Sequence, residues 1–148
     1  QLNYIQRKLM DINYHIYGSN KYLEKHGMPK SINDLSKHNF ISFGRGAPSP
    51  VFNPDWALKL GIKDNKKRKP VMKVNSVMGL LLAVESGVGL AALPDYLVSL
   101  SRNVIKVLPS VEGPITEAHF VFPESLKNVA RVTTFRNFLY SKISEFKS

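Results

Sequence analysis

The sequence predicts an α/β fold in which a mixed sheet is flanked by helices. Apolar runs of strand length alternate with segments of helical periodicity along the whole chain, and this order is typical of α/β domains. The clearest unit is residues 74–94, in which a polar cap, an apolar helix, a Gly-x-Gly turn, an all-apolar strand and a proline follow one another. With 148 residues, the chain is long enough for one domain, or two small lobes, with a real core.

The first part of the chain reads as strands separated by two capped helices. Ser19 is a good helix cap, and Gly27 suits the end of that helix. The expected elements are strands at residues 3–10, 15–18, 40–43, 56–60 and 71–74, a helix from Ser19 to Gly27 and a short helix from Ser31 to Lys37. Residues 44–54 hold three prolines and two glycines, so they are expected to form a loop.

Positive charge is concentrated between two of these strands. The net charge is +10, and Lys63–Lys69 is the one true basic cluster. We interpret it as a solvated loop that joins the two strands, so replacing Lys66–Lys69 by neutral residues should leave folding intact. A phosphate-binding patch of a nucleic-acid-binding module is the alternative, although no recognition helix or RNA-stacking motif accompanies the cluster.

The unit at 74–94 begins with a capped helix. Asn75 or Ser76 can cap it, because a short side-chain oxygen accepts a hydrogen bond from a backbone N–H of the first turn. The helix is expected over residues 76–86, and Gly87 suits the left-handed residue that ends it. Free N–H groups at its start form a natural anion site.

A buried strand is expected over residues 90–93, closed by Pro94, which can also open another helix. The rest of the chain is predicted to hold a helix at 95–100, strands at 104–108 and 119–122, and a long helix at 128–146. The long helix carries one apolar stripe, which consists of Val132, Phe135, Leu139, Ile143 and Phe146.

Several kinds of chemistry are excluded or unsupported. The chain has no cysteine, so disulfides, thiolate metal sites and thiol catalysis are excluded. No two of its four histidines have metal-ligand spacing, and no Gly-x-Ser-x-Gly elbow exists. We therefore predict that the protein has no catalytic residue, binds no metal or cofactor, and is not an enzyme. No signal peptide is visible, and the longest apolar-rich run makes a poor membrane span.

Four stretches together resemble one family, the inducer-binding domain of LysR-type transcriptional regulators, which has a fold similar to the type 2 periplasmic-binding proteins. The matching stretches are 17–29, with its Tyr-Leu and His-Gly-x-Pro motifs, 32–41, with Asp-Leu and a following His, 74–94, and 120–139. The resemblance rests on the order and spacing of these motifs along the chain.

The resemblance implies two lobes. Residues 14–114 would be the second lobe, and residues 1–13 and 115–148 an incomplete first lobe. The first lobe's opening part and a DNA-binding winged helix would be absent from this chain, so DNA would be bound only through that absent domain. It also implies a cytoplasmic protein that does not bind membranes and forms a homodimer or a higher oligomer.

The resemblance further implies a sensor that binds a small metabolite between its lobes and shifts conformation. We expect an organic anion, because the start of the 76–86 helix would face the cleft. The expected ligand-binding residues are Asn75, Ser76, Val77, Leu93, Pro94, Phe43 and Gly44, of which Phe43 is the most readily explained by core packing. A solute-binding protein of a transporter, with a similar fold, is the alternative.

Overall fold

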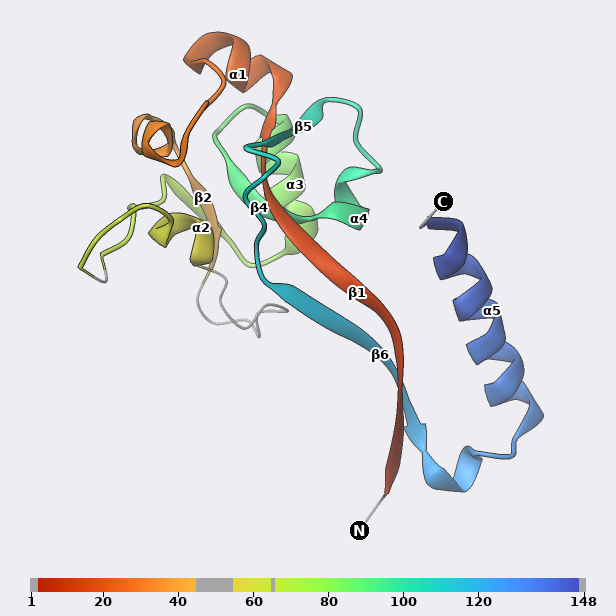
Figure 1. Ribbon diagram of the computed structural model, residues 1–148. Coiled ribbons are helices and arrows are strands. Elements are labelled where there is room, and N and C mark those ends of the chain that lie inside the picture. The colour runs from red at the N-terminus through yellow and green to blue at the C-terminus, as the bar shows by residue number, and fades with distance from the viewer. Residues whose placement is uncertain (1–2, 45–54, 65, 147–148) are drawn as a thin grey trace. The chain divides into compact units, whose positions relative to one another are not determined.

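The computed structural model describes residues 3–44, 55–64 and 66–146 (Figure 1). Its strands are β1 (Tyr4–Ser19), β2 (Ile41–Phe43), β3 (Met72–Val74), β4 (Ala91–Pro94), β5 (Val104–Val107) and β6 (Ile115–Pro123). Its α-helices are α1 (Asn20–His26), α2 (Trp56–Lys59), α3 (Val77–Glu85), α4 (Asp95–Val98) and α5 (Ala130–Phe146), with 3₁₀ turns η1 (Ile32–Lys37) and η2 (Glu124–Leu126). The mixed α/β class predicted from the sequence is confirmed.

The chain forms two compact units. Unit 1 comprises Gln1–Ile12 and Thr116–Ser148, and unit 2 comprises Asn13–Ile115. The interpretation of these units as lobes of a sensor domain stays a prediction.

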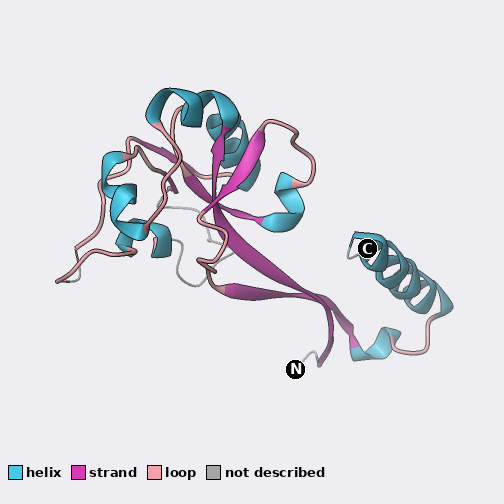
Figure 2. Cartoon of the chain, turned by 45° about the horizontal axis from the view of Figure 1, so that its top comes forward, coloured by secondary structure: helices cyan, strands magenta, loops and turns pink. Residues whose placement is uncertain are grey.

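Unit 2 has three layers, with helices on both faces of its strands (Figure 2). β4 and β5 pair antiparallel with the two edges of β1, and β2 pairs parallel with β3. Successive strand residues point to opposite faces, so Ile16 and Tyr17 of β1 belong to two different core clusters. The Tyr17 cluster packs under α3 and α4, and the Ile16 cluster packs under α1, η1 and α2. Because β4 is covered on both faces, its sequence is apolar without alternation.

The starts of α1 and η1 follow the predicted capping chemistry. The Ser19 hydroxyl accepts a hydrogen bond from the Tyr22 N–H at 3.3 Å, and Gly27, with φ of 83°, ends α1. Ser31 and Asp34 form the predicted capping box, although the turn that follows is 3₁₀.

Two sequence-based predictions about strands were wrong. Residues 56–59 of the strand expected at 56–60 form α2 instead, because a short apolar run does not distinguish a strand from a helix and Ala, Leu and Lys are good helix formers. The separate strands at 3–10 and 15–18 are one continuous β1, since Tyr14, in the polar interruption, pairs with Pro94 and its carbonyl accepts the Gly113 N–H at 2.8 Å.

The basic cluster joins α2 to β3 and is not fully solvated. The Arg68 guanidinium donates to the Leu60 carbonyl at 2.7 Å and lies over the ring of Phe40, 5.5 Å from its centroid. Burial lowers the pKa of Arg68. The prediction of a loop replaceable without effect on folding is therefore revised for Arg68, which anchors this segment. Asn65, and residues 45–54 of the expected 44–54 loop, lie outside the described residues.

In unit 1, β6 pairs with β1, and α5 is attached to both strands. The Tyr140 hydroxyl donates to the Lys8 carbonyl at 2.8 Å, and Phe135 meets Phe120 edge to face at 5.8 Å. Part of the predicted apolar stripe of α5 remains exposed to solvent. Phe135, a member of the stripe, is 52% accessible. The side chain of Phe146, the last member of the stripe, lies outside the described residues.

Candidate functional site

The carboxyl ends of β2, β3 and β4 lie at one edge of unit 2. β2 and β3 are parallel, and Phe40 and Leu90, just before β2 and β4, form a parallel bridge in which the Ile41 N–H donates to the Leu90 carbonyl at 2.8 Å. In open α/β sheets, ligands bind outside the carboxyl ends of the strands. This edge holds all the segments that the sequence predicted to bind a ligand.

Two of those segments are in direct contact. The Gly44 N–H, after β2, donates to the Val74 carbonyl at 2.7 Å. A Cβ on Gly44 would lie 3.6 Å from that carbonyl and 3.8 Å from the Asn75 backbone nitrogen. The structure therefore brings Phe43–Gly44 beside Asn75 and the start of α3, although they are about thirty residues apart in the sequence.

The start of α3 is exposed and capped by its own side chain. The Ser76 hydroxyl accepts a hydrogen bond from the Gly79 N–H at 3.3 Å, and the Ser76 carbonyl accepts the first helical bond from Leu80 at 2.9 Å. Among the described residues, no acceptor faces the N–H groups of Val77 and Met78. A capped helix start with two free donors suits an anionic group.

The other predicted residues differ in accessibility. Leu93 and Pro94 are fully buried, so their side chains belong to the core and only their backbone is available to a ligand. Phe43 is half-buried and packs against the cluster under α3, whereas Asn75 and Ser76 are exposed.

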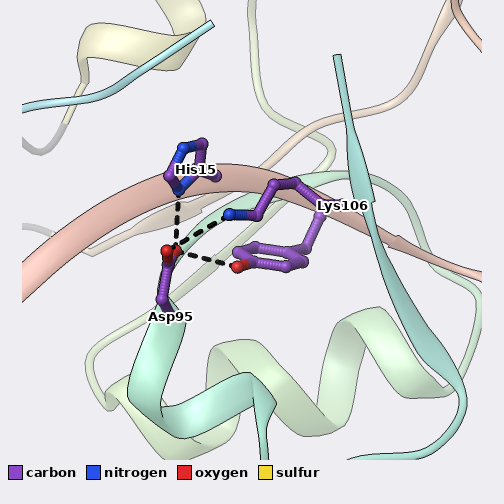
Figure 3. A network of polar contacts seen from close by, with 4 residues as sticks. His15, Asp95 and Lys106 are labelled. Carbon is purple, nitrogen blue, oxygen red and sulfur yellow. Dashed lines mark hydrogen bonds and ion pairs between the residues drawn. The ribbon is translucent and has the colours of Figure 1, made fainter. Parts of the chain in front are cut away.

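Directly after Pro94, Asp95 forms a polar network that sequence reasoning missed. Its Oδ1 lies 2.8 Å from the His15 Nδ1 and accepts the Tyr17 hydroxyl at 2.8 Å, and its Oδ2 accepts the Lys106 ammonium at 3.2 Å. Figure 3 shows His15 and Lys106 converging on this carboxylate. The network ties the first residue of α4 to both β1 and β5.

The electrostatics of the network favour an ionised Asp95. Partial burial disfavours the charge, but hydrogen bonds from His15, Tyr17 and Lys106 outweigh it and hold the pKa of the Asp95 carboxyl below its usual value. Burial, and then the hydrogen bond to Asp95, raise the pKa of the Tyr17 phenol well above its usual range. The Tyr17 phenol therefore stays protonated at physiological pH and donates its hydrogen bond to Asp95.

His15 of this network also lines a nearby hollow. The hollow has a volume of about 260 Å³ and is lined by Asn13, Tyr14, His15, Glu112, Gly113 and Ile115. A more polar hollow of about 330 Å³, lined by residues such as Lys21, Glu24 and Glu85, lies around the start of α1 and the end of α3. Within the described residues, no group of three or more His, Asp and Glu side chains is placed to hold a metal ion.

The comparison with protein families shows to which family the chain belongs. Residues 2–143 match the model of the LysR substrate binding domain. The chain belongs to this family. The LysR domain is part of transcriptional regulators and is not an enzyme.

Individual relatives agree with the LysR assignment. An uncharacterised HTH-type transcriptional regulator of Haemophilus influenzae is 28% identical over 134 residues, which cover 87% of this chain and 45% of that protein. The HTH-type transcriptional regulator CrgA of Neisseria meningitidis is 30% identical over 103 residues, which cover 70% of this chain and 33% of CrgA. This LysR domain thus spans less than half the length of the curated relatives it matches.

The LysR fold is also found in a solved structure of the CrgA regulatory domain from Neisseria meningitidis. That structure superposes with a TM-score of 0.76 at 24% identity and covers 95% of this chain and 69% of its own. In the described part of this LysR domain, none of the helices combines the length and apolar character needed to cross a membrane.

Proposed function

We propose that this LysR domain senses a small organic anion at the carboxyl edge of unit 2, and that binding shifts the regulator between conformations. The start of α3 carries the proposal. There the N–H groups of Val77 and Met78 face no acceptor among the described residues, Asn75 is exposed, and the Gly44 N–H is hydrogen-bonded to the Val74 carbonyl just before Asn75. The alternative, a transporter's solute-binding protein, is disfavoured because both curated relatives are HTH-type transcriptional regulators.

The Ser76→Asp variant tests this site. Aspartate can still cap α3, but its charge repels an anion at the same N–H groups. We expect the melting temperature to stay within a few degrees and the affinity for an anionic ligand to fall by about 1–3 kcal/mol, the value of a lost charge-assisted hydrogen bond. The measurement is calorimetric titration with a carboxylate selected from a panel of mono- and dicarboxylic acids by thermal shift.

Ser76→Asn is the matched control, because asparagine caps as well as aspartate and has nearly the same shape without the charge. We expect it to bind the selected carboxylate about as well as the unmodified chain. Equal affinities for Ser76→Asp and Ser76→Asn would place the site elsewhere. The absence of any stabilising carboxylate in the panel would contradict the proposal of an organic-anion ligand.

We also propose that the chain self-associates through unit 1 and that sequence-specific DNA reading belongs to a part of the regulator outside this chain. Phe135 and Phe138 of α5 are each about half exposed, and large apolar groups left exposed on one helix favour a protein partner over water. Sedimentation velocity at micromolar concentration should give a dimer that Phe135→Ser with Phe138→Ser weakens. A single monomer peak across that range would contradict self-association.

A further inference from the structure

More than half of the chain's net charge lies in fifteen residues that run from the end of α2 into β3. Residues 59–73, here called the basic segment, contain seven basic residues and one acidic residue, a net charge of +6 out of +10. Described residues of this segment between α2 and β3 extend away from the helices and strands of unit 2 in both views (Figures 1 and 2). Such a concentration on one projecting segment is the electrostatic footprint of an anionic partner.

Two of the seven basic side chains are committed to the fold. Arg68 donates to the Leu60 carbonyl, and Lys67 pairs with Asp55. The other five are exposed, and none has an ion pair within the described residues, which include every Asp and Glu of the chain. These five are Lys59, Lys63, Lys66, Lys69 and Lys73.

The basic segment is held in place before any partner binds. The Arg68 N–H donates to the Leu58 carbonyl at 2.9 Å, and the Ile62 N–H donates to the Lys59 carbonyl at 3.0 Å. Arg68 also lies over the buried Phe40 ring. A fixed backbone lowers the ordering cost of binding for the lysines that it carries.

The simplest alternative explanation is that lysines protect the edge strand β3 from pairing with other chains. That explanation accounts for Lys73, which is in β3, but not for Lys63 or Lys66, which are not in a strand. Five uncompensated like charges within fifteen residues also repel one another, and this repulsion destabilises the compact state unless an anion relieves it.

We propose that the basic segment contacts the phosphate backbone of duplex DNA. DNA is the anion that fits the observations best, since the curated relatives are HTH-type transcriptional regulators. Lysine is a point charge suited to phosphate, whereas base reading mostly needs planar or bidentate side chains presented by a groove-filling element. The four-residue α2 is too short for that role, so the contact is independent of sequence and adds to DNA reading elsewhere in the regulator.

The test compares two fourfold variants of this chain by fluorescence anisotropy with a labelled 30-base-pair duplex of arbitrary sequence. The first, Lys63→Gln with Lys66→Gln, Lys69→Gln and Lys73→Gln, neutralises the basic segment and leaves Arg68 and Lys67 in place. The control, Lys21→Gln with Lys25→Gln, Lys30→Gln and Lys127→Gln, removes the same charge from exposed lysines elsewhere. Melting temperatures show whether both variants are folded.

We expect the unmodified chain to bind the duplex at low salt, with an affinity that falls by a slope of about 0.9 per phosphate contact in a plot of log affinity against log salt. The basic-segment variant should lose at least about tenfold in affinity and most of that slope, while the control loses less than about threefold. Equal losses in the two variants, or no salt-dependent binding by the unmodified chain, would overturn the proposal.

A second arm separates DNA from a lipid surface. Flotation with vesicles of equal parts phosphatidylglycerol and phosphatidylcholine should show no difference between the basic-segment variant and its control. If only vesicle binding depends on the basic segment and duplex affinity does not, the surface serves a membrane and the proposal is wrong.

Discussion

Replacing Phe40 with alanine is expected to lower the free energy of unfolding of unit 2 by about 3–5 kcal/mol, the usual cost of truncating a fully buried Phe. Phe40 is 1% exposed and belongs to the Ile16 cluster. Its backbone also links neighbouring elements, because its carbonyl accepts the Val71 N–H at 2.8 Å and Phe40 bridges to Leu90. The cavity left by the ring would also remove the surface on which Arg68 lies.

Urea unfolding followed by tryptophan fluorescence measures this loss in the right part of the chain. Trp56 is the single tryptophan, and it packs against the same cluster as Phe40. Phe138→Ala is the matched control, because Phe138 is 53% exposed on α5 of unit 1. At submicromolar concentration we expect it to shift the Trp56 transition by less than about 0.5 kcal/mol, as for most surface changes. Similar losses in the two variants would mean that Phe40 is not a core residue.

The sequence predicted the unit around α3 well because its signals are local. Ser76 caps the helix, Gly87 has φ of 80° at its end, and residues 90–93 are buried apart from the half-buried Ala92. A cap, a left-handed glycine and an apolar run each act within a few residues, so no knowledge of the rest of the fold is needed.

Where tertiary contacts decide the structure, sequence reasoning failed. Residues 56–59 form a single helical turn because Ala57 and Leu58 fill the Ile16 cluster beside α1 and η1, and a four-residue run has no periodicity to read. β1 continues through Asn13 and Tyr14 because Pro94 and Gly113 supply partners for that part of the strand.

The candidate site divides in the same way. The capped helix start at Ser76 follows from local chemistry, and its position beside Gly44 was expected only from the family resemblance. The Asp95 network escaped notice because His15 lies eighty residues from Asp95 in the sequence. A short side chain after a strand-ending proline was the one available signal, and it does not identify its partners.

Asp95→Asn is the second variant with a large expected effect. The substitution keeps the side-chain shape but removes the charge that accepts hydrogen bonds from His15, Tyr17 and Lys106. A hydrogen bond to a charged group is worth about 1.5–3 kcal/mol. Asp95 is about one-third exposed, so hydrogen bonds to water offset part of that loss. We expect the free energy of unfolding of the variant at pH 7 to be about 2–3 kcal/mol lower than that of the unmodified chain.

The pH dependence gives this prediction its specific signature. The pKa of Asp95 is lower in the folded chain than in the unfolded chain, where a free aspartate titrates near 3.9. Its contribution to stability is therefore complete above the unfolded-state pKa and is lost as the pH falls through the folded-state pKa. The difference in unfolding free energy between the Asp95→Asn variant and the unmodified chain should be largest above about pH 5 and should shrink steadily below about pH 4.

Urea unfolding of both proteins from pH 7 down to pH 3, again with Trp56 as the probe, measures that difference directly. Asp64→Asn serves as the control, because Asp64 is exposed, makes no ion pair with the described residues and has a φ of 64° that asparagine adopts readily. It should change stability by less than about 0.5 kcal/mol at every pH. If instead Asp95→Asn gives a loss that does not vary with pH, the network stabilises through shape alone, and an ionised Asp95 is not what ties α4 to β1 and β5.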